Sequence, residues 1–212
     1  MTRTTGRRLE VMRIFDSPAL QPGDLAWDGA TLWHVDRQRN LIYNIDADTG
    51  EVLQEFEFVG RAAGIAASKD FLWVTDASVP MIYCFDRHSH AVVGHLPVPA
   101  ETAGEGALAF DGVSLWQVDN PRAQLLRLDA VSGALLEVVE VDANLTGLSE
   151  VAGDLVFCDF GDGSLRRLNV ENKLTRATYQ LPGTPLGLAW ESANRFWYVD
   201  ADFGQLCQLR LV

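Results

Sequence analysis

The feature that most constrains this 212-residue sequence is an aspartate that ends an apolar run and recurs along the chain. Each copy lies in a unit of roughly 40 residues that holds four short apolar runs, separated by turn-forming pairs such as Asp28-Gly29 and Thr49-Gly50. The copies are Asp36, Asp76, Asp119, Asp159 and Asp200, at spacings of 40, 43, 40 and 41 residues. Repeats of this length and strand content are typical of β-propeller blades. The sequence therefore predicts an all-β fold, a five-bladed β-propeller with four-stranded antiparallel blades.

The two ends of the chain are predicted to complete the last blade together. The fifth unit stops one strand short, and its three apolar runs are 188–190, 195–199 and 205–212. Because proteins avoid unpaired sheet edges, we expect the N-terminal strand at 9–15 to supply the missing outer strand. This predicts a single propeller domain at 9–212 after a flexible tail at 1–8. The inner strands of the blades are expected to start near residues 24, 64, 107, 147 and 187.

The charge balance argues against two classes of partner. The chain has 29 acidic and 17 basic residues and a net charge of −12, whereas nucleic acids and anionic membranes attract basic surfaces. No apolar run approaches the roughly 18 to 20 residues that cross a bilayer. Residues 1–10 lack the apolar stretch of a secretory signal. We therefore expect a cytoplasmic protein with no nucleic-acid partner and no membrane partner.

Two repeated residue types are interpreted as structural. Four of the five aspartates are preceded, three residues earlier, by a tryptophan that we expect to pack between blades: Trp33, Trp73, Trp116 and Trp197. The aspartates are expected to accept backbone N–H groups from the turns that follow their strands. A ring of carboxylates holding Ca²⁺ is the alternative, and it requires several oxygens that converge on one site. The three cysteines are expected to be buried free thiols: Cys84, Cys158 and Cys207.

The candidate binding residues are those that differ between blades on one face of the ring. By analogy with the fold, two sets of loops are expected to surround the mouth of the central channel. One set joins each outer strand to the next inner strand, and the other joins the second strand to the third. Polar loop residues around such a mouth could hold a small polar molecule. The predicted substrate-binding residues are Asp24, Arg61, Arg122, Asn144, Thr146, Phe160 and Phe203, and Arg37 and Asn120 belong to the same loops.

Glu105 is the catalytic candidate. It lies between Gly104 and Gly106 directly before an inner strand, so its carboxylate should be near the axis and partly desolvated. A desolvated carboxylate has a raised pKa and can act as a general acid or base. No metal site and no cofactor are predicted, because the metal-like spacing at 88–90 falls in a turn at the rim and the chain has no nucleotide-binding fingerprint.

The repeated phrases DLAWDGATLWHVD, ALAFDGVSLWQVD and IYNIDADTGEV resemble the blades of the glutamine cyclotransferases and of the streptogramin B lyases. The lyases have seven blades and the glutaminyl cyclases five, so the predicted blade count favours the second family. The stretch Gly104-Glu105-Gly106-Ala107 is similar to the Gly-Glu-Gly-Ile stretch of the glutaminyl cyclases, whose glutamate transfers the proton. The resemblance therefore implies a proton-transfer role for Glu105.

Two functional hypotheses follow. The first is an enzyme that performs glutamine-cyclotransferase-like acid–base chemistry on a small polar substrate, of the amide or lactone type, at the channel mouth. The second is a non-catalytic propeller that binds a ligand or a protein partner on the same face. Turnover that depends on Glu105 distinguishes the two hypotheses.

Overall fold

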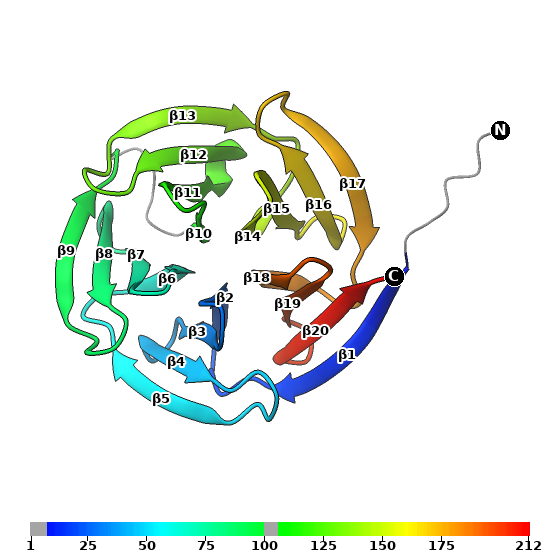
Figure 1. The fold of residues 1–212 in the computed structure, drawn as a ribbon, viewed down its shortest axis with the longest axis horizontal. Coiled ribbons are helices and arrows are strands. Elements are labelled where there is room, and N and C mark those ends of the chain that lie inside the picture. Colours follow the sequence, from blue (N-terminus) through cyan, green and yellow to red (C-terminus); the bar gives the residue numbers. More distant parts are fainter. Residues whose placement is uncertain (1–7, 100–105) are drawn as a thin grey trace.

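The computed structural model describes residues 8–99 and 106–212, which form five four-stranded sheets arranged as blades around one axis (Figure 1). The first blade contains β2 (Pro22–Trp27), β3 (Leu32–Asp36), β4 (Leu41–Ile45) and β5 (Val52–Glu57). The second contains β6 (Ala62–Ala67), β7 (Phe71–Asp76), β8 (Met81–Asp86) and β9 (Val92–Pro97). The third contains β10 (Leu108–Phe110), β11 (Ser114–Asp119), β12 (Gln124–Asp129) and β13 (Leu135–Glu140), with the 3-10 helix η1 (Asn120–Arg122) after β11.

The last two blades complete the ring. The fourth contains β14 (Leu145–Val151), β15 (Asp154–Asp159), β16 (Ser164–Asn169) and β17 (Leu174–Gln180). The fifth contains β18 (Pro185–Ser192), β19 (Arg195–Asp200) and β20 (Gln205–Leu211), and its outer strand is β1 (Leu9–Asp16). All neighbouring strands in these sheets are antiparallel. The five-bladed propeller with four-stranded antiparallel blades is confirmed.

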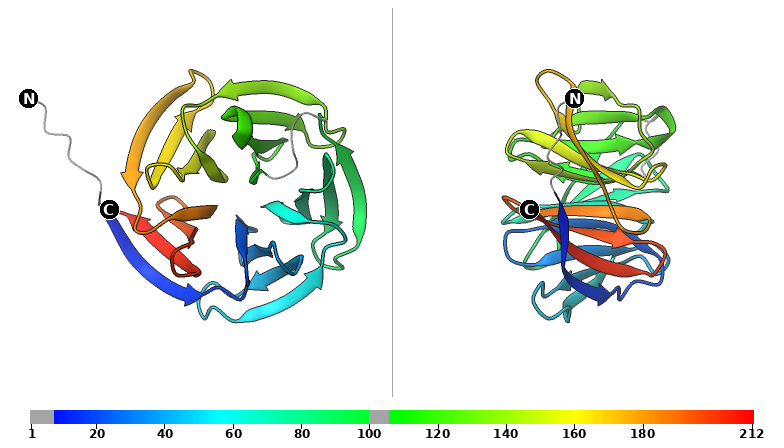
Figure 2. Two further views of the ribbon diagram at one scale, coloured as in Figure 1. Left: turned by 180° about the vertical axis from the view of Figure 1, so that it is seen from behind. Right: turned by 90° about the vertical axis from the view of Figure 1, so that its right-hand side faces the viewer.

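The two ends of the chain close the ring as predicted. β1 pairs with β20 from Leu9 opposite Leu211 to Asp16 opposite Gln205, and the two strands lie side by side at the edge of the disc in both ribbon views (Figure 2). Arg8 and Val212 continue the pairing, because each donates its backbone N–H to the carbonyl of the other. Arg8, which the sequence placed in a flexible tail at 1–8, therefore belongs to this pairing, and residues 1–7 lie outside the described residues.

The core consists of five apolar clusters, one between each pair of neighbouring blades. The repeated tryptophans are buried in them, and the exposed fraction of their side chains is at most 4%. This confirms the prediction that the tryptophans are core residues. Glycines bring the inner strands close together near the axis, since a Cβ on Gly187 would lie 2.7 Å from the carbonyl oxygen of Gly23 in the next blade.

An acidic side chain at the end of the first strand of a blade, or in the turn after it, binds the tryptophan of that blade. In the first blade Asp28 Oδ2 accepts the Trp33 indole N–H at 2.9 Å and also pairs with Arg87 of the second blade. Asp111 holds Trp116 and Glu191 holds Trp197 in the same way, at 2.9 Å each. In the second blade the corresponding residue is Ser68, and Trp73 Nε1 is buried without a partner in the described part of the chain. The acid–indole contact is thus a repeated structural device that one blade lacks.

The recurring aspartates hold the loops on the channel-mouth face. Asp36 accepts N–H bonds from Leu20 and Gln21 in the loop before its blade and from Gln38 and Arg39 in the turn after β3. Asp76, Asp159 and Asp200 do the same with their own loops. These bonds confirm the structural interpretation for four of the five aspartates. Within the described residues, Asp119 instead accepts an N–H from the side chain of Arg122, and its Oδ1 has no hydrogen-bond partner. Within 8–99 and 106–212, no three His, Cys, Asp or Glu side chains form a group that could hold a metal ion.

Candidate functional site

A cavity of about 360 Å³ opens at one end of the propeller axis. Its walls are the first residues of the inner strands and the turns between second and third strands, which are the two loop sets predicted to surround the channel mouth. Five of the lining residues carry polar side chains that could contact a bound molecule: Asp24, Arg37, Asn120, Asn144 and Thr146. Three of these five, Asp24, Asn144 and Thr146, are predicted binding residues, and the structure brings them together here.

Asp24 lies on β2 with only 4% of its surface exposed. Its Oδ2 accepts the backbone N–H groups of Ile65 on β6 and Leu108 on β10, at 3.1 Å each. The carboxyl therefore ties the inner strands of three blades together across the axis. Its other oxygen, Oδ1, is buried and has no hydrogen-bond partner among the described residues. Burial raises the pKa of Asp24 to about 8, and the backbone N–H bonds offset only part of this effect.

The backbone at Asp24 is held by a buried histidine on the neighbouring strand β3. His34 is fully buried, and its Nδ1 lies 3.2 Å from the carbonyl oxygen of Asp24. Its Nε2 lies 2.8 Å from the hydroxyl of Ser17. Burial lowers the pKa of His34 to about 4, so the ring is neutral near pH 7. A neutral ring that donates from Nδ1 to Asp24 accepts the Ser17 hydroxyl proton at Nε2.

Arg37 directly follows Asp36, the last residue of β3. Its side chain runs past Gly23 to the cavity. A Cβ on Gly23 would lie 2.9 Å from Cγ of Arg37, so the aliphatic part of the arginine packs against the glycine backbone beside Asp24. The guanidinium makes no hydrogen bond or ion pair with any described residue, and the side chain is exposed. A free guanidinium in a cavity wall is available to an incoming ligand.

Asn120, Asn144 and Thr146 complete the polar lining. Asn120 begins η1 directly after Asp119, and the backbone N–H of Asn144 is bound by Asp159 at 3.1 Å. Thr146 Oγ1 donates to the carbonyl of Pro185 at 3.1 Å, which leaves its oxygen available as an acceptor. Arg37 and Asn120 take corresponding places, each immediately after the aspartate that closes a second strand. The position directly after a recurring aspartate is therefore the sequence signal that identifies both residues as candidates for the site.

The other predicted site residues lie elsewhere on the described surface. Arg61 is exposed and does not line the cavity, and Arg122 pairs with Asp119 at 2.9 Å. Phe160 and Phe203 are 45% and 74% exposed and also lie outside the cavity wall. Glu105 lies outside the described residues, although the next residue, Gly106, lines the cavity.

A smaller cavity of about 190 Å³ lies at the other end of the axis. It is lined by later residues of the inner strands, including Leu25 and Leu108, together with Trp27, Phe110 and Trp190. Asp24 lines only the first cavity, and Leu25 lines only the second. Asp24 and Leu25 thus lie at the boundary between the residues that line the two cavities.

The fold and this cavity define a class, the five-bladed β-propellers with a polar pocket at one end of the axis. Among solved structures, the chain is similar to the glutaminyl cyclase of Myxococcus xanthus, with a TM-score of 0.79, 13% identity, and coverage of 97% of this chain and 98% of that one. It is also similar to virginiamycin B lyase from Staphylococcus aureus, with a TM-score of 0.57, 18% identity, and coverage of 90% and 66%. A regucalcin from Agrobacterium tumefaciens gives a TM-score of 0.61 at 13% identity, with coverage of 92% and 91%.

These similarities concern the fold alone, because the sequence identities are low. No protein-family model matches the chain, and no curated protein sequence matches it. The resemblance to glutaminyl cyclases and streptogramin lyases expected from the repeat phrases is thus confirmed at the level of structure.

Proposed function

We propose that the protein is an enzyme that binds a small polar molecule of the amide or lactone type in the axial cavity and transfers a proton on it. The observation that carries this proposal is that the buried carboxyl of Asp24, the guanidinium of Arg37 and two side-chain amides meet in one cavity, and that this guanidinium has no partner among the described residues. A cavity with a few convergent polar groups and a carboxyl of shifted pKa is typical of active sites. The likeness in fold to the glutaminyl cyclase of Myxococcus xanthus supports the same chemistry by analogy.

In this proposal Glu105 transfers the proton, and residues of the cavity wall hold the substrate. Glu105 directly precedes Gly106 in the sequence, and Gly106 lines the cavity. Asn144 and Thr146 would bind the polar groups of a substrate inside the cavity. Arg61, Arg122, Phe160 and Phe203, which the cavity does not include, would contact parts of a larger substrate that extend over the same face.

Turnover assays test the proposal directly. The purified protein would be incubated with N-terminal glutaminyl peptides, other small amides and small lactones, and the products would be followed by mass spectrometry. We expect one of these classes to be converted, and Glu105→Gln to reduce kcat by about 100-fold or more, as loss of a general acid or base does.

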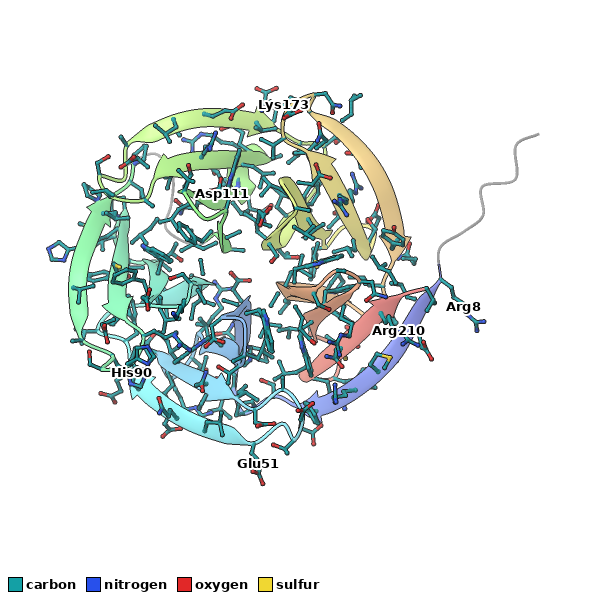
Figure 3. All side chains as sticks on the ribbon, in the orientation of Figure 1. Arg8, Glu51, His90, Asp111, Lys173 and Arg210 are labelled. Carbon is teal, nitrogen blue, oxygen red and sulfur yellow. The ribbon has the colours of Figure 1, made fainter. Side chains whose placement is uncertain are left out.

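Glu51→Gln is the matched control, because Glu51 is an exposed carboxylate at the rim of the ring, far from the axis (Figure 3). It should leave turnover unchanged. Wild-type activity in a well-folded Glu105→Gln protein would remove Glu105 from the mechanism, and an absence of turnover for all three substrate classes would contradict the enzyme proposal.

A specific observation favours the second hypothesis, a non-catalytic binding module. Apolar side chains in the loops and turns of the channel-mouth face are well exposed, including Leu20 at 63%, Val59 at 90% and Phe203 at 74%. Exposed apolar residues around a polar pocket are a common feature of protein-binding faces. Under this hypothesis the assays above give no turnover, while Phe203→Ser weakens the binding of a partner without unfolding the propeller.

A further inference from the structure

We propose that the axial cavity is a site for small carboxylates, in which Arg37 pairs with the carboxylate group and the carboxyl of Asp24 donates a hydrogen bond to a second oxygen of the same molecule. This inference rests on the cavity of the proposed function and adds the chemical class of its ligand. It concerns binding, so it can be tested whether or not turnover is found.

The first argument is that the cavity wall contains a guanidinium, the side chain that best matches a carboxylate. Arg37 offers a planar guanidinium with no partner among the described residues, and such a group binds a carboxylate through two parallel bonds. Asn120 and Asn144 each add an amide NH₂ group to the same wall. A guanidinium with donor NH₂ groups beside it favours a ligand that carries a carboxylate.

The second argument concerns the two oxygens of Asp24. Oδ2 already accepts two backbone N–H groups, so a proton on this carboxyl belongs on Oδ1. Oδ1 is buried and has no partner in the described part of the chain. A buried O–H group without an acceptor is costly. Because Asp24 lines the cavity, a small movement of its side chain would bring Oδ1 to an acceptor oxygen of a bound ligand.

The protonation state follows from the surroundings of Asp24. Burial raises its pKa to about 8, so the carboxyl is mostly neutral at pH 7. The titratable or charged described groups around it are His34 on β3, Cys158 on β15 and Arg37 in the cavity wall. Burial lowers the pKa of His34 to about 4 and raises that of Cys158, so neither carries a charge near pH 7. Arg37 then gives this part of the cavity a positive charge, in favour of an anion.

The net charge of −12 acts at longer range. Charges more than about 10 Å away are largely screened at moderate salt, whereas a guanidinium in contact with a carboxylate is screened much less. Local contacts therefore determine which ligand the cavity prefers. As pH rises above the pKa of Asp24, a second negative charge forms beside the ligand and opposes its binding.

A matched pair of probes tests the inference. N-acetylglycine has a carboxylate and an acyl oxygen, and N-acetylglycinamide has the same acyl oxygen with a neutral amide in place of the carboxylate. Binding of each would be followed by NMR titration of the ¹⁵N-labelled protein. We expect the acid to bind at least about tenfold more tightly than the amide near pH 6, and Arg37→Gln to abolish that preference. Arg8→Gln, at the edge of the ring (Figure 3), should leave it unchanged.

The pH dependence tests the role of Asp24. We expect the affinity of the wild-type protein for N-acetylglycine to fall by up to about tenfold for each pH unit above the pKa of Asp24. Asp24→Asn keeps a hydrogen-bond donor but cannot ionise, so it should bind the acid with little change between pH 6 and pH 9, roughly. Equal affinities for acid and amide, an unchanged preference in Arg37→Gln, or no binding of either probe at millimolar concentration would overturn the inference. Absence of turnover, in contrast, would count only against the enzyme proposal.

Discussion

Two aspartates of the first blade, Asp24 and Asp36, have pKa values that are shifted in opposite directions. Burial acts to raise the pKa of Asp36, but hydrogen bonds from Leu20 and Arg39 outweigh it and lower that pKa to about 2. For Asp24 burial dominates, and the pKa rises to about 8. At Asp24 burial outweighs the backbone N–H bonds, and one oxygen has no partner among the described residues. Asp36 accepts bonds at both oxygens, and one of its donors is the charged guanidinium of Arg39.

The raised pKa of Asp24 predicts how stability depends on pH. Between about pH 4 and pH 8 the unfolded chain has lost the Asp24 proton, whereas the folded protein still holds it. The free energy of unfolding should therefore decrease as pH rises through this window, by at most about 1.4 kcal/mol per pH unit. Asp24→Asn removes this contribution, so its stability should depend less on pH and exceed that of the wild type most clearly above pH 8.

Urea unfolding at several pH values measures this effect as the difference between variant and wild type. Asp70→Asn, at an exposed carboxylate in the turn between β6 and β7, provides the comparison. If the stabilities of the wild-type and Asp24→Asn proteins followed parallel curves across this pH range, Asp24 would be ionised throughout and the neutral form would be ruled out.

The individual blades were the most predictable elements. The strands, the turns and the closing of the ring by the N-terminal strand follow from a repeat whose pattern is local to about 40 residues. The site depends on contacts that no local pattern reveals. Asp24 binds backbone groups 41 and 84 residues away. Arg37 reaches the cavity only because Gly23 leaves room for its side chain.

The turn between the first two strands of the second blade lacks the acid that the other tryptophan-containing blades have. In that turn Ser68 Oγ accepts the backbone N–H groups of Asp70 and Phe71, at 3.3 and 3.0 Å. In the first blade, Asp28 Oδ1 makes the corresponding bonds while Oδ2 also holds Trp33. Ser68→Asp should keep the turn and add a partner for Trp73 Nε1, which raises the free energy of unfolding by about 1 kcal/mol.

The reverse substitution, Asp28→Ser, is the matched control. It removes the bond to Trp33 and the ion pair with Arg87, so it should lower the free energy of unfolding by about 1 to 3 kcal/mol. Denaturant unfolding of both variants measures the two changes in the free energy of unfolding. A loss in Asp28→Ser without any gain in Ser68→Asp would show that the second turn does not present its side chain to the indole.

At the scale of the whole molecule, each of the five blades has a place between its third and outer strands where the ring could hold the chain ends. The natural opening lies between the third and the outer strand of the fifth blade. The turn between β12 and β13 is the corresponding place in the third blade, and Val131 in this turn is 86% exposed. A circular permutant that joins Val212 to Arg8 by a short linker and opens after Val131 should therefore fold into the same ring.

Circular dichroism and thermal unfolding would compare the permutant with the natural chain, and we expect similar spectra and midpoints within a few degrees. Opening the chain inside β3 provides the contrast, since that strand is buried and hydrogen-bonded on both edges. Such a permutant should fail to fold. If the opening after Val131 were equally damaging, the order in which the blades form would matter more than their final contacts.

The carboxyl of Asp24 is bound to the inner strands of the second and third blades, so it joins three blades beside the axial cavity. The next residue, Leu25, lines the smaller cavity, and the two cavities have no lining residue in common. Under the proposed function, substrate and product would share the single cavity at the mouth. A product that stayed there would occupy the groups that the next substrate molecule needs.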